Sequence, residues 1–153
     1  MDIPVERLIV GAGSSELILL AAHALLDSTR SVVMSRYSFI SYEGAARSVG
    51  ARTIIVPTRG WQPDLETMVD AIEPDTRLLF IASPNNPTGV VVEPDALERM
   101  LAAVPEHVLV VLDEAYRDFV APSRCVDVRK LVERHENLLV LRTFSKVYGL
   151  SGL

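Results

Sequence analysis

Three polar side chains in the sequence could do covalent and proton-transfer chemistry together: Lys146, Asp113 and Asn86. Each comes shortly after an apolar run of the kind that forms a buried strand. A lysine that is half removed from water at a strand end is a nucleophile toward an aldehyde. A lone Ser-Lys pair is ordinarily a surface loop, so Lys146 becomes significant only if other segments favour the same ligand.

The segment at 83–89, Ser-Pro-Asn-Asn-Pro-Thr-Gly, is one of these. Two prolines restrict its backbone, Gly89 permits a tight turn, and Asn86 lies between the fixed points. We therefore expect the Asn86 amide to be presented to a ligand. Asp113 is the first residue of Asp-Glu-Ala-Tyr116, at the carboxyl end of a predicted parallel strand, where open α/β sheets bind ligands. The alternative for Asp113 is a helix N-cap.

Two further segments suit an anion and a flat ring. Gly-Ala-Gly-Ser-Ser-Glu at 11–16 follows a predicted strand at 7–10 and precedes a predicted helix at 17–26, so backbone N–H groups at Ser14 and Ser15 could bind a phosphate. Ser14 is also a candidate N-cap. The segment lacks the third glycine of a dinucleotide-binding turn, which argues against an NAD site.

Hydroxyl groups near the lysine suit the same anion, because the Thr143 and Ser145 side chains could also contact a phosphate. Phe39 lies at a strand-to-helix turn, where it could stack on a flat ligand ring. We expect Tyr42, three residues later, to be a core residue on one face of the following helix.

The elements that position these residues alternate between strand and helix about six times. We expect strands at 7–10, 31–34, 51–56, 77–82, 108–112 and 138–141, and helices at 17–26, 40–49, 94–103 and 126–134, with a short helix capped by Asp64. This pattern predicts an α/β fold of three layers (α/β/α), with a mostly parallel sheet and helices on both faces. The polar strand ends then meet along one edge.

Composition excludes several kinds of function. The chain has 153 residues, a net charge of −5, one cysteine and three histidines. It shows no basic stripe for nucleic acid, no disulfide, no metal-ligand spacing, no apolar run long enough to cross a membrane and no signal peptide. We therefore expect a cytoplasmic protein that consists of one domain over residues 1–153.

One ligand satisfies all of these groups. A phosphorylated, cationic heteroaromatic aldehyde needs an amine for its aldehyde, a carboxylate for its ring nitrogen, donors for its ring hydroxyl and a stacking ring. That ligand is pyridoxal phosphate. The corresponding residues are Lys146 for the aldehyde, Asp113 for the ring nitrogen, Asn86 and Tyr116 for the hydroxyl, Phe39 for stacking, and Ser14, Ser15, Thr143 and Ser145 for the phosphate. Once freed from the aldehyde, Lys146 could also act as general base and acid.

The segments at 83–89, 113–116 and 143–153 together resemble the fold-type I aminotransferases that use pyridoxal phosphate, and most closely the histidinol-phosphate aminotransferases. Residues 11–16 are similar to that family's phosphate turn, and residues 38–42 to its stacking segment. The resemblance covers essentially the whole chain. It implies the same roles for Lys146, Asp113 and the other residues, and a reaction between an amino phosphate and 2-oxoglutarate in histidine biosynthesis.

The resemblance also implies elements that this chain lacks: an N-terminal arm, a small C-terminal domain with an arginine for the substrate carboxylate, and a partner subunit's tyrosine. We therefore expect an incomplete large domain of an enzyme that is a homodimer at full length, inactive by itself. Four alternatives stay open: an aromatic or other amino-acid aminotransferase, a decarboxylase of amino-acid phosphates, a non-catalytic cofactor-sensing domain, and a truncated, non-functional product.

Overall fold

The computed structural model describes residues 3–151, and its centre is a five-stranded sheet in the order β2-β1-β5-β6-β7. Every neighbouring pair is parallel. The strands are β1 (Ser31–Ser35), β2 (Arg52–Val56), β5 (Thr76–Ala82), β6 (Leu109–Asp113) and β7 (Leu138–Leu141). Nearly all residues of β1, β5 and β6 are buried, which explains their continuous apolar runs.

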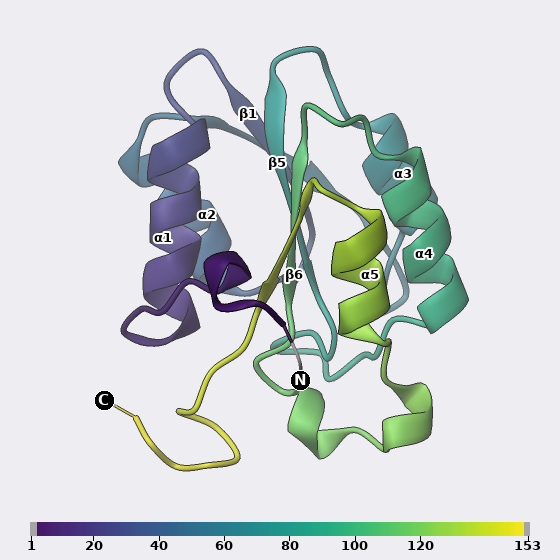
Figure 1. Cartoon of the computed structure of the whole chain (residues 1–153). Helices are drawn as coiled ribbons and strands as arrows, with labels where there is room; N and C mark the ends of the chain where they lie inside the picture. Colours follow the sequence, from purple (N-terminus) through teal and green to yellow (C-terminus); the bar gives the residue numbers. More distant parts are fainter. Residues whose placement is uncertain (1–2, 152–153) are drawn as a thin grey trace.

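Helices cover both faces of the sheet (Figure 1). One face carries α1 (Gly13–Leu25) and α2 (Ile40–Ser48). The other carries α3 (Leu65–Asp70), α4 (Pro94–Ala103) and α5 (Val128–Arg134). The chain moves outward from β1 to β2 and then returns past β1 to β5. Because crossovers between parallel strands are right-handed, this reversal places α2 and the later helices on opposite faces. The predicted three-layer α/β architecture is confirmed.

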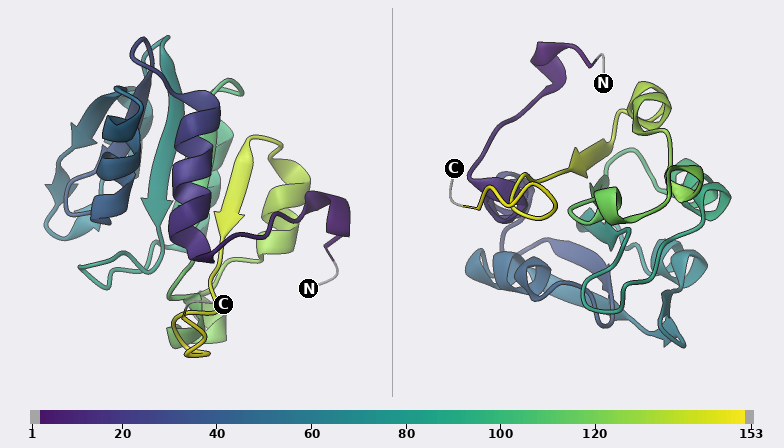
Figure 2. Two further views of the ribbon diagram at one scale, coloured as in Figure 1. Left: turned by 90° about the vertical axis from the view of Figure 1, so that its left-hand side faces the viewer. Right: turned by 90° about the horizontal axis from the view of Figure 1, so that it is seen from below.

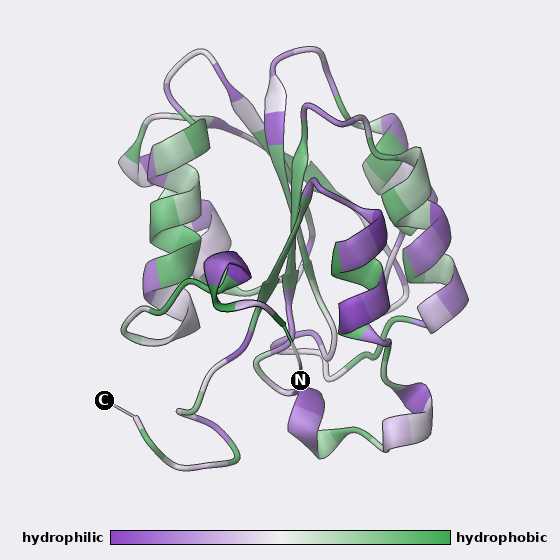
Figure 3. Ribbon diagram, viewed as in Figure 1, coloured by the Kyte–Doolittle hydropathy of each residue, from purple (hydrophilic) through white to green (hydrophobic). Residues whose placement is uncertain are grey.

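Each face of the sheet has its own hydrophobic core. Val33 and Leu79 point toward α3, α4 and α5, where they pack with Leu97 of α4. Their strand neighbours point the other way, and Phe80 packs there with Ile18 of α1. Figure 3 shows the matching pattern, with apolar residues along the sheet and polar residues on the outer surfaces of α4 and α5.

Smaller elements lie outside the sheet. A two-stranded hairpin consists of β3 (Thr58–Arg59) and β4 (Gln62–Pro63). Single turns of 3-10 helix are formed by η1 (Val5–Arg7), η2 (Arg117–Phe119) and η3 (Pro122–Arg124).

The predicted strand at 7–10 is wrong. Residues 5–7 form η1, and residues 8–12 run without a sheet partner to the start of α1. Val10 is 94% exposed and Ile9 is 67% exposed. The apolar run therefore has neither a neighbouring strand nor a core to pack against within residues 3–151.

The topology brings the polar segments to one end of the molecule. Asp113, the last residue of β6, pairs with Ala82 of β5 on one side and Leu141 of β7 on the other. The loop at 83–89 and the segment from Arg142 onward thus leave the sheet beside Asp113. Figure 2 shows the C-terminal segment below this end of the sheet, near the first turn of α1.

Candidate functional site

A small cavity of about 80 Å³ lies at the carboxyl ends of β5 and β6. Seven of the nine residues that we expected at a site line it: Ser14, Ser15, Phe39, Asn86, Asp113, Tyr116 and Lys146. They come from five separate parts of the chain. The remaining lining residues are Tyr42, Ala82, Pro84 and Ala115. Thr143 and Ser145 lie beside the cavity, next to Lys146.

Asp113 is the buried acid of this cavity, with 6% of its surface exposed. Its Oδ2 accepts a hydrogen bond of 2.8 Å from the Tyr42 hydroxyl, and its Oδ1 accepts one of 3.0 Å from the Ala115 N–H. Burial raises the pKa of Asp113, while these hydrogen bonds and the Lys146 charge oppose the rise. A carboxylate has about four acceptor positions, so Asp113 keeps capacity for a cationic donor in the cavity.

Tyr42 is a site residue that the sequence analysis placed only in the core. It is fully buried, as expected, and its ring stacks on Phe80 at a centroid distance of 4.6 Å. Burial and the Asp113 charge raise the pKa of the Tyr42 hydroxyl, so it remains a donor at neutral pH. The sequence signals were its spacing from Phe39, whose ring meets it edge-on at 5.8 Å, and the resemblance of residues 38–42 to the family's stacking segment.

Lys146 is exposed, which corrects the expectation that it would be half desolvated. Its Nζ donates to Ser145 Oγ at 3.2 Å and lies 5.8 Å from the centre of the Tyr116 ring. In the segment that follows β7, Thr143 is buried, whereas Phe144, Val147 and Tyr148 are exposed. Lys146 is nevertheless one of the residues that line the cavity.

Hydroxyl groups and a helix start lie at the Lys146 end of the cavity. Thr143 Oγ1 is 2.8 Å from Ser145 Oγ and accepts from the Ser145 N–H at 3.2 Å. A side chain added at Gly13, the first residue of α1, would place its Cβ 3.8 Å from Thr143 Oγ1. The N-cap of α1 is Ala12, so the expected N-cap at Ser14 is wrong. Ser14 is instead a buried residue of the first turn.

The side chain of Asn85 holds the loop at 83–89 in place through two hydrogen bonds, one within the loop and one to the segment after β1. The Asn85 side chain donates to the Tyr37 carbonyl at 3.0 Å and to Thr88 Oγ1 at 2.8 Å. Gly89 has a φ of +71°, which a residue with a side chain rarely adopts. Asn85 thus ties the loop to the segment after β1, and its neighbour Asn86 lines the cavity.

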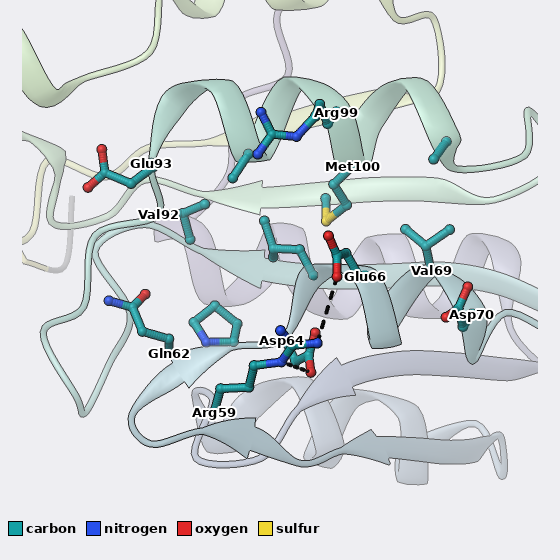
Figure 4. A pocket seen from close by; sticks show the side chains of 14 residues that line it. Arg59, Gln62, Asp64, Glu66, Val69, Asp70, Val92, Glu93, Arg99 and Met100 are labelled. Carbon is teal, nitrogen blue, oxygen red and sulfur yellow. Dashed lines mark hydrogen bonds and ion pairs between the residues drawn. The ribbon is translucent and has the colours of Figure 1, made fainter.

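A larger cavity, of about 440 Å³, lies elsewhere, between α3, α4 and the β3–β4 hairpin (Figure 4). Its floor is apolar, with Val69, Val92 and Met100, and at its rim Arg59 pairs with Asp64. None of the site residues expected from the sequence lines it. Within residues 3–151 there is no cluster of three or more metal-ligating side chains, and no helix is long and apolar enough to cross a bilayer.

Known proteins resemble this chain in sequence and in fold. The model of the family described as aminotransferase class I and II matches residues 2–153. The chain belongs to this aminotransferase family. A histidinol-phosphate aminotransferase of Cupriavidus pinatubonensis is 49% identical over 100% of the chain, and one of Nitrosococcus oceani is 45% identical. The chain spans 41% of the length of each, about two fifths of these curated relatives.

A solved structure from the same family supports the fold. The histidinol-phosphate aminotransferase of Sinorhizobium meliloti, described in complex with pyridoxal-5'-phosphate, superimposes with a TM-score of 0.87 at 29% identity. The match covers 93% of this chain and 39% of that one.

The buried acid Asp113 predicts that the stability of this chain depends on pH. Burial raises the folded-state pKa of Asp113 above its ordinary value of 3.8, so the folded chain binds a proton that the unfolded chain has released. Without ligand, the free energy of unfolding should therefore fall as pH rises from about 4 through the raised pKa. The pKa of Glu114 is also raised by burial and adds a fall of the same sign. Denaturant unfolding at a series of pH values measures this slope.

In the Asp113→Asn variant the fall should be shallower, because one of the two buried acids no longer ionises. The matched control is Asp95→Asn, at an exposed position in the first turn of α4. An Asp113→Asn profile that coincides with the wild-type profile would contradict the prediction.

Proposed function

We propose that the chain carries the cofactor-binding core of a pyridoxal-phosphate-dependent aminotransferase. The reaction proposed for the full-length enzyme moves an amino group between an amino phosphate such as histidinol phosphate and 2-oxoglutarate, in histidine biosynthesis. The observation that carries this proposal is the single cavity that brings Lys146, Asp113, Asn86 and Tyr116 together. The names of the most similar relatives support the choice of substrate.

The polar groups around the cavity fit the different parts of this cofactor. Lys146 supplies an amine for the aldehyde, and Asp113 supplies a buried carboxylate with free acceptor capacity for a cationic ring nitrogen. Phe39 supplies an aromatic face. The first turn of α1 supplies N–H groups beside the Thr143 and Ser145 hydroxyls, a combination suited to a phosphate. When bound, pyridoxal phosphate supplies an electron sink for carbanion chemistry at the substrate Cα.

The residues of the chain have separate tasks in this proposal. Asp113, held by Tyr42 and the Ala115 N–H, stabilises a positive charge at the ring nitrogen. Asn86 and Tyr116 orient the ring through its hydroxyl, and Phe39 limits its tilt. Ser14, Ser15, Thr143 and Ser145 hold the phosphate. Lys146 moves a proton to and from the substrate Cα, because its Nζ is a free amine once the substrate amine has taken its place.

The full-length enzyme is proposed to be a cytoplasmic homodimer that acts on small molecules and binds neither nucleic acid nor membranes. Residues 1–153 form the cofactor-binding part of its large domain in this proposal. Exposed apolar side chains support the need for further protein contacts, since Leu8, Ile9 and Val10 are 53%, 67% and 94% exposed.

The first test is capture of the cofactor by the purified chain. Addition of pyridoxal phosphate should produce a visible absorbance band that borohydride removes, and peptide mapping by mass spectrometry should place the reduced label on Lys146. The chain has only one other lysine, Lys130 on α5, which serves as an internal control. Label on Lys130 or the amino terminus alone would contradict the proposed site.

The second test is turnover with histidinol phosphate and 2-oxoglutarate, followed as glutamate formed. We expect transfer by the full-length enzyme and none by the 153-residue chain, because the resemblance assigns the arginine for the substrate carboxylate and the partner subunit's tyrosine to segments outside these residues. Faster transfer from aromatic amino acids would favour the alternative aminotransferase, and release of CO₂ would favour a decarboxylase. Amino-group transfer by the purified 153-residue chain would contradict the expectation that activity requires parts of the enzyme outside these residues.

A further inference from the structure

Glu114 is a buried carboxylate that follows Asp113 and does not line the cavity. Only 3% of it is exposed. Its Oε2 accepts hydrogen bonds from Nε and Nη2 of Arg142, at 3.0 and 2.9 Å. Its Oε1 lies 3.4 Å from Nε of Arg117. Glu114 is thus hydrogen-bonded to Arg142 and forms an ion pair without hydrogen-bond geometry with Arg117, whose Nε has no other partner within residues 3–151. A buried charge of this kind is tolerated because it is paired.

The two arginines belong to segments that carry site residues. Arg142 is the first residue after β7 and stands four positions before Lys146. Arg117 directly follows Tyr116 and begins η2. A backbone hydrogen bond of 2.9 Å, from the Glu114 N–H to the Leu141 carbonyl, joins the same strand ends. Glu114 therefore links the segment that carries Lys146 and the segment that carries Tyr116 to the end of β6.

The Lys146 segment has few other attachments to the sheet end. Its large apolar residues are exposed, with Phe144 at 69%, Val147 at 45% and Tyr148 at 57%. Its two turn hydrogen bonds, Gly149 N–H to the Lys146 carbonyl and Leu150 N–H to the Phe144 carbonyl, are internal to the segment. The segment is therefore anchored mainly at its start, where Thr143 is buried and Arg142 meets Glu114.

We propose that Glu114 is a positioning residue for the candidate site. Through Arg142 and Arg117 it sets where Lys146 and Tyr116 stand relative to Asp113, although it contacts neither the cavity nor its ligand. The assignment rests on the proposed function, because it gives Glu114 the task of placing the amine that captures the cofactor. Both contacts from Arg142 go to a single oxygen, Oε2, which an amide oxygen could also supply, so Glu114→Gln removes mainly the negative charge that strengthens them and places an NH2 group or an uncharged oxygen toward Arg117.

The test compares Glu114→Gln with the wild-type chain in two measurements. The first is the rate at which pyridoxal phosphate and borohydride label Lys146, measured at a series of cofactor concentrations. The concentration dependence gives two separate quantities, the half-saturating cofactor concentration and the maximal labelling rate. We expect the maximal rate to fall about tenfold or more, because a displacement of about 1 Å can cost about 10²-fold. The half-saturating concentration should change less, because the ring and phosphate contacts are intact.

The second measurement is hydrogen exchange without cofactor, which should become faster at 142–151 and stay unchanged in α4. Two further variants complete the design. Arg142→Lys keeps the positive charge and loses the two-nitrogen contact, so it should slow labelling in the same way. Glu98→Gln removes a surface pair with Arg134 at 3.3 Å and is the matched control. All variants are measured at a temperature at which each one is folded.

A purely structural role for Glu114 would lower the unfolding temperature and leave the maximal labelling rate of the folded protein unchanged, which would overturn the proposal. If the wild-type chain takes no label on Lys146, the proposed function fails instead. Hydrogen exchange then still decides whether Glu114 holds the segment: faster exchange at 142–151 supports the positioning role, and unchanged exchange overturns it.

Discussion

Replacement of Lys146 by alanine is expected to abolish covalent capture of pyridoxal phosphate by this chain. The amine is the cavity group that can bond to an aldehyde, and methyl has no nucleophilic atom. We expect the initial rate of borohydride-stable labelling to fall at least about 100-fold, to the background of an exposed amine. Reversible binding should persist, because Asp113 and the phosphate-binding hydroxyls remain.

The matched control for this prediction is Lys130→Ala. Lys130 lies on α5, is also exposed, and does not line the cavity. Its Nζ is 3.5 Å from Oδ2 of Asp127, the N-cap of α5. Its replacement should leave labelling of Lys146 at the wild-type rate. Wild-type labelling kinetics in Lys146→Ala, with the label on any other residue, would show that the cavity does not capture the cofactor.

Asp113→Asn is expected to weaken reversible binding of pyridoxal phosphate about 100-fold, roughly 3 kcal/mol. Asparagine has nearly the same shape, and its oxygen can accept from the Ala115 N–H while its NH2 donates to the Tyr42 hydroxyl oxygen, so the change removes mainly the negative charge opposite the ring nitrogen. The measurement is a fluorescence or absorbance titration in the Lys146→Ala background, where no covalent step contributes.

Asp95→Asn in the same background controls for loss of one negative charge from the protein. The thermal stability of ligand-free Asp113→Asn should be at least that of its parent at neutral pH, because a buried ionised group has been removed. Unweakened binding would show that Asp113 is not the partner of the ring nitrogen.

The strands and the residues at their ends could be predicted from the sequence, because apolar runs and the polar residues that follow them are local features of the chain. The apolar runs that became β5, β6 and β7 end at the polar residues of the cavity, and a parallel sheet brings such ends together. The same reasoning failed at 7–10, where an apolar run lies exposed. A short run shows that a segment is apolar, and whether another strand lies beside it depends on the rest of the fold.

The contacts that were missed join residues far apart in the sequence. The Tyr42 hydroxyl reaches Asp113 across 71 positions, and Arg142 reaches Glu114 across 28. Spacing along the chain holds no information on such pairs. The exposure of Lys146 was missed for a related reason, since burial at a strand end requires covering elements and none within residues 3–151 covers it.

The order of strands in the sheet has a consequence for biosynthesis. Within residues 3–151, β7 is an edge strand and the last of the five along the chain, and Lys146 lies just beyond it. A nascent polypeptide therefore completes the Asp113 side of the cavity before the amine has left the ribosome. Parallel pairing of distant segments is intrinsically slow, so β7 is expected to dock after β5 and β6 have paired. Until then, the edge of β6 is open to pairing with another chain.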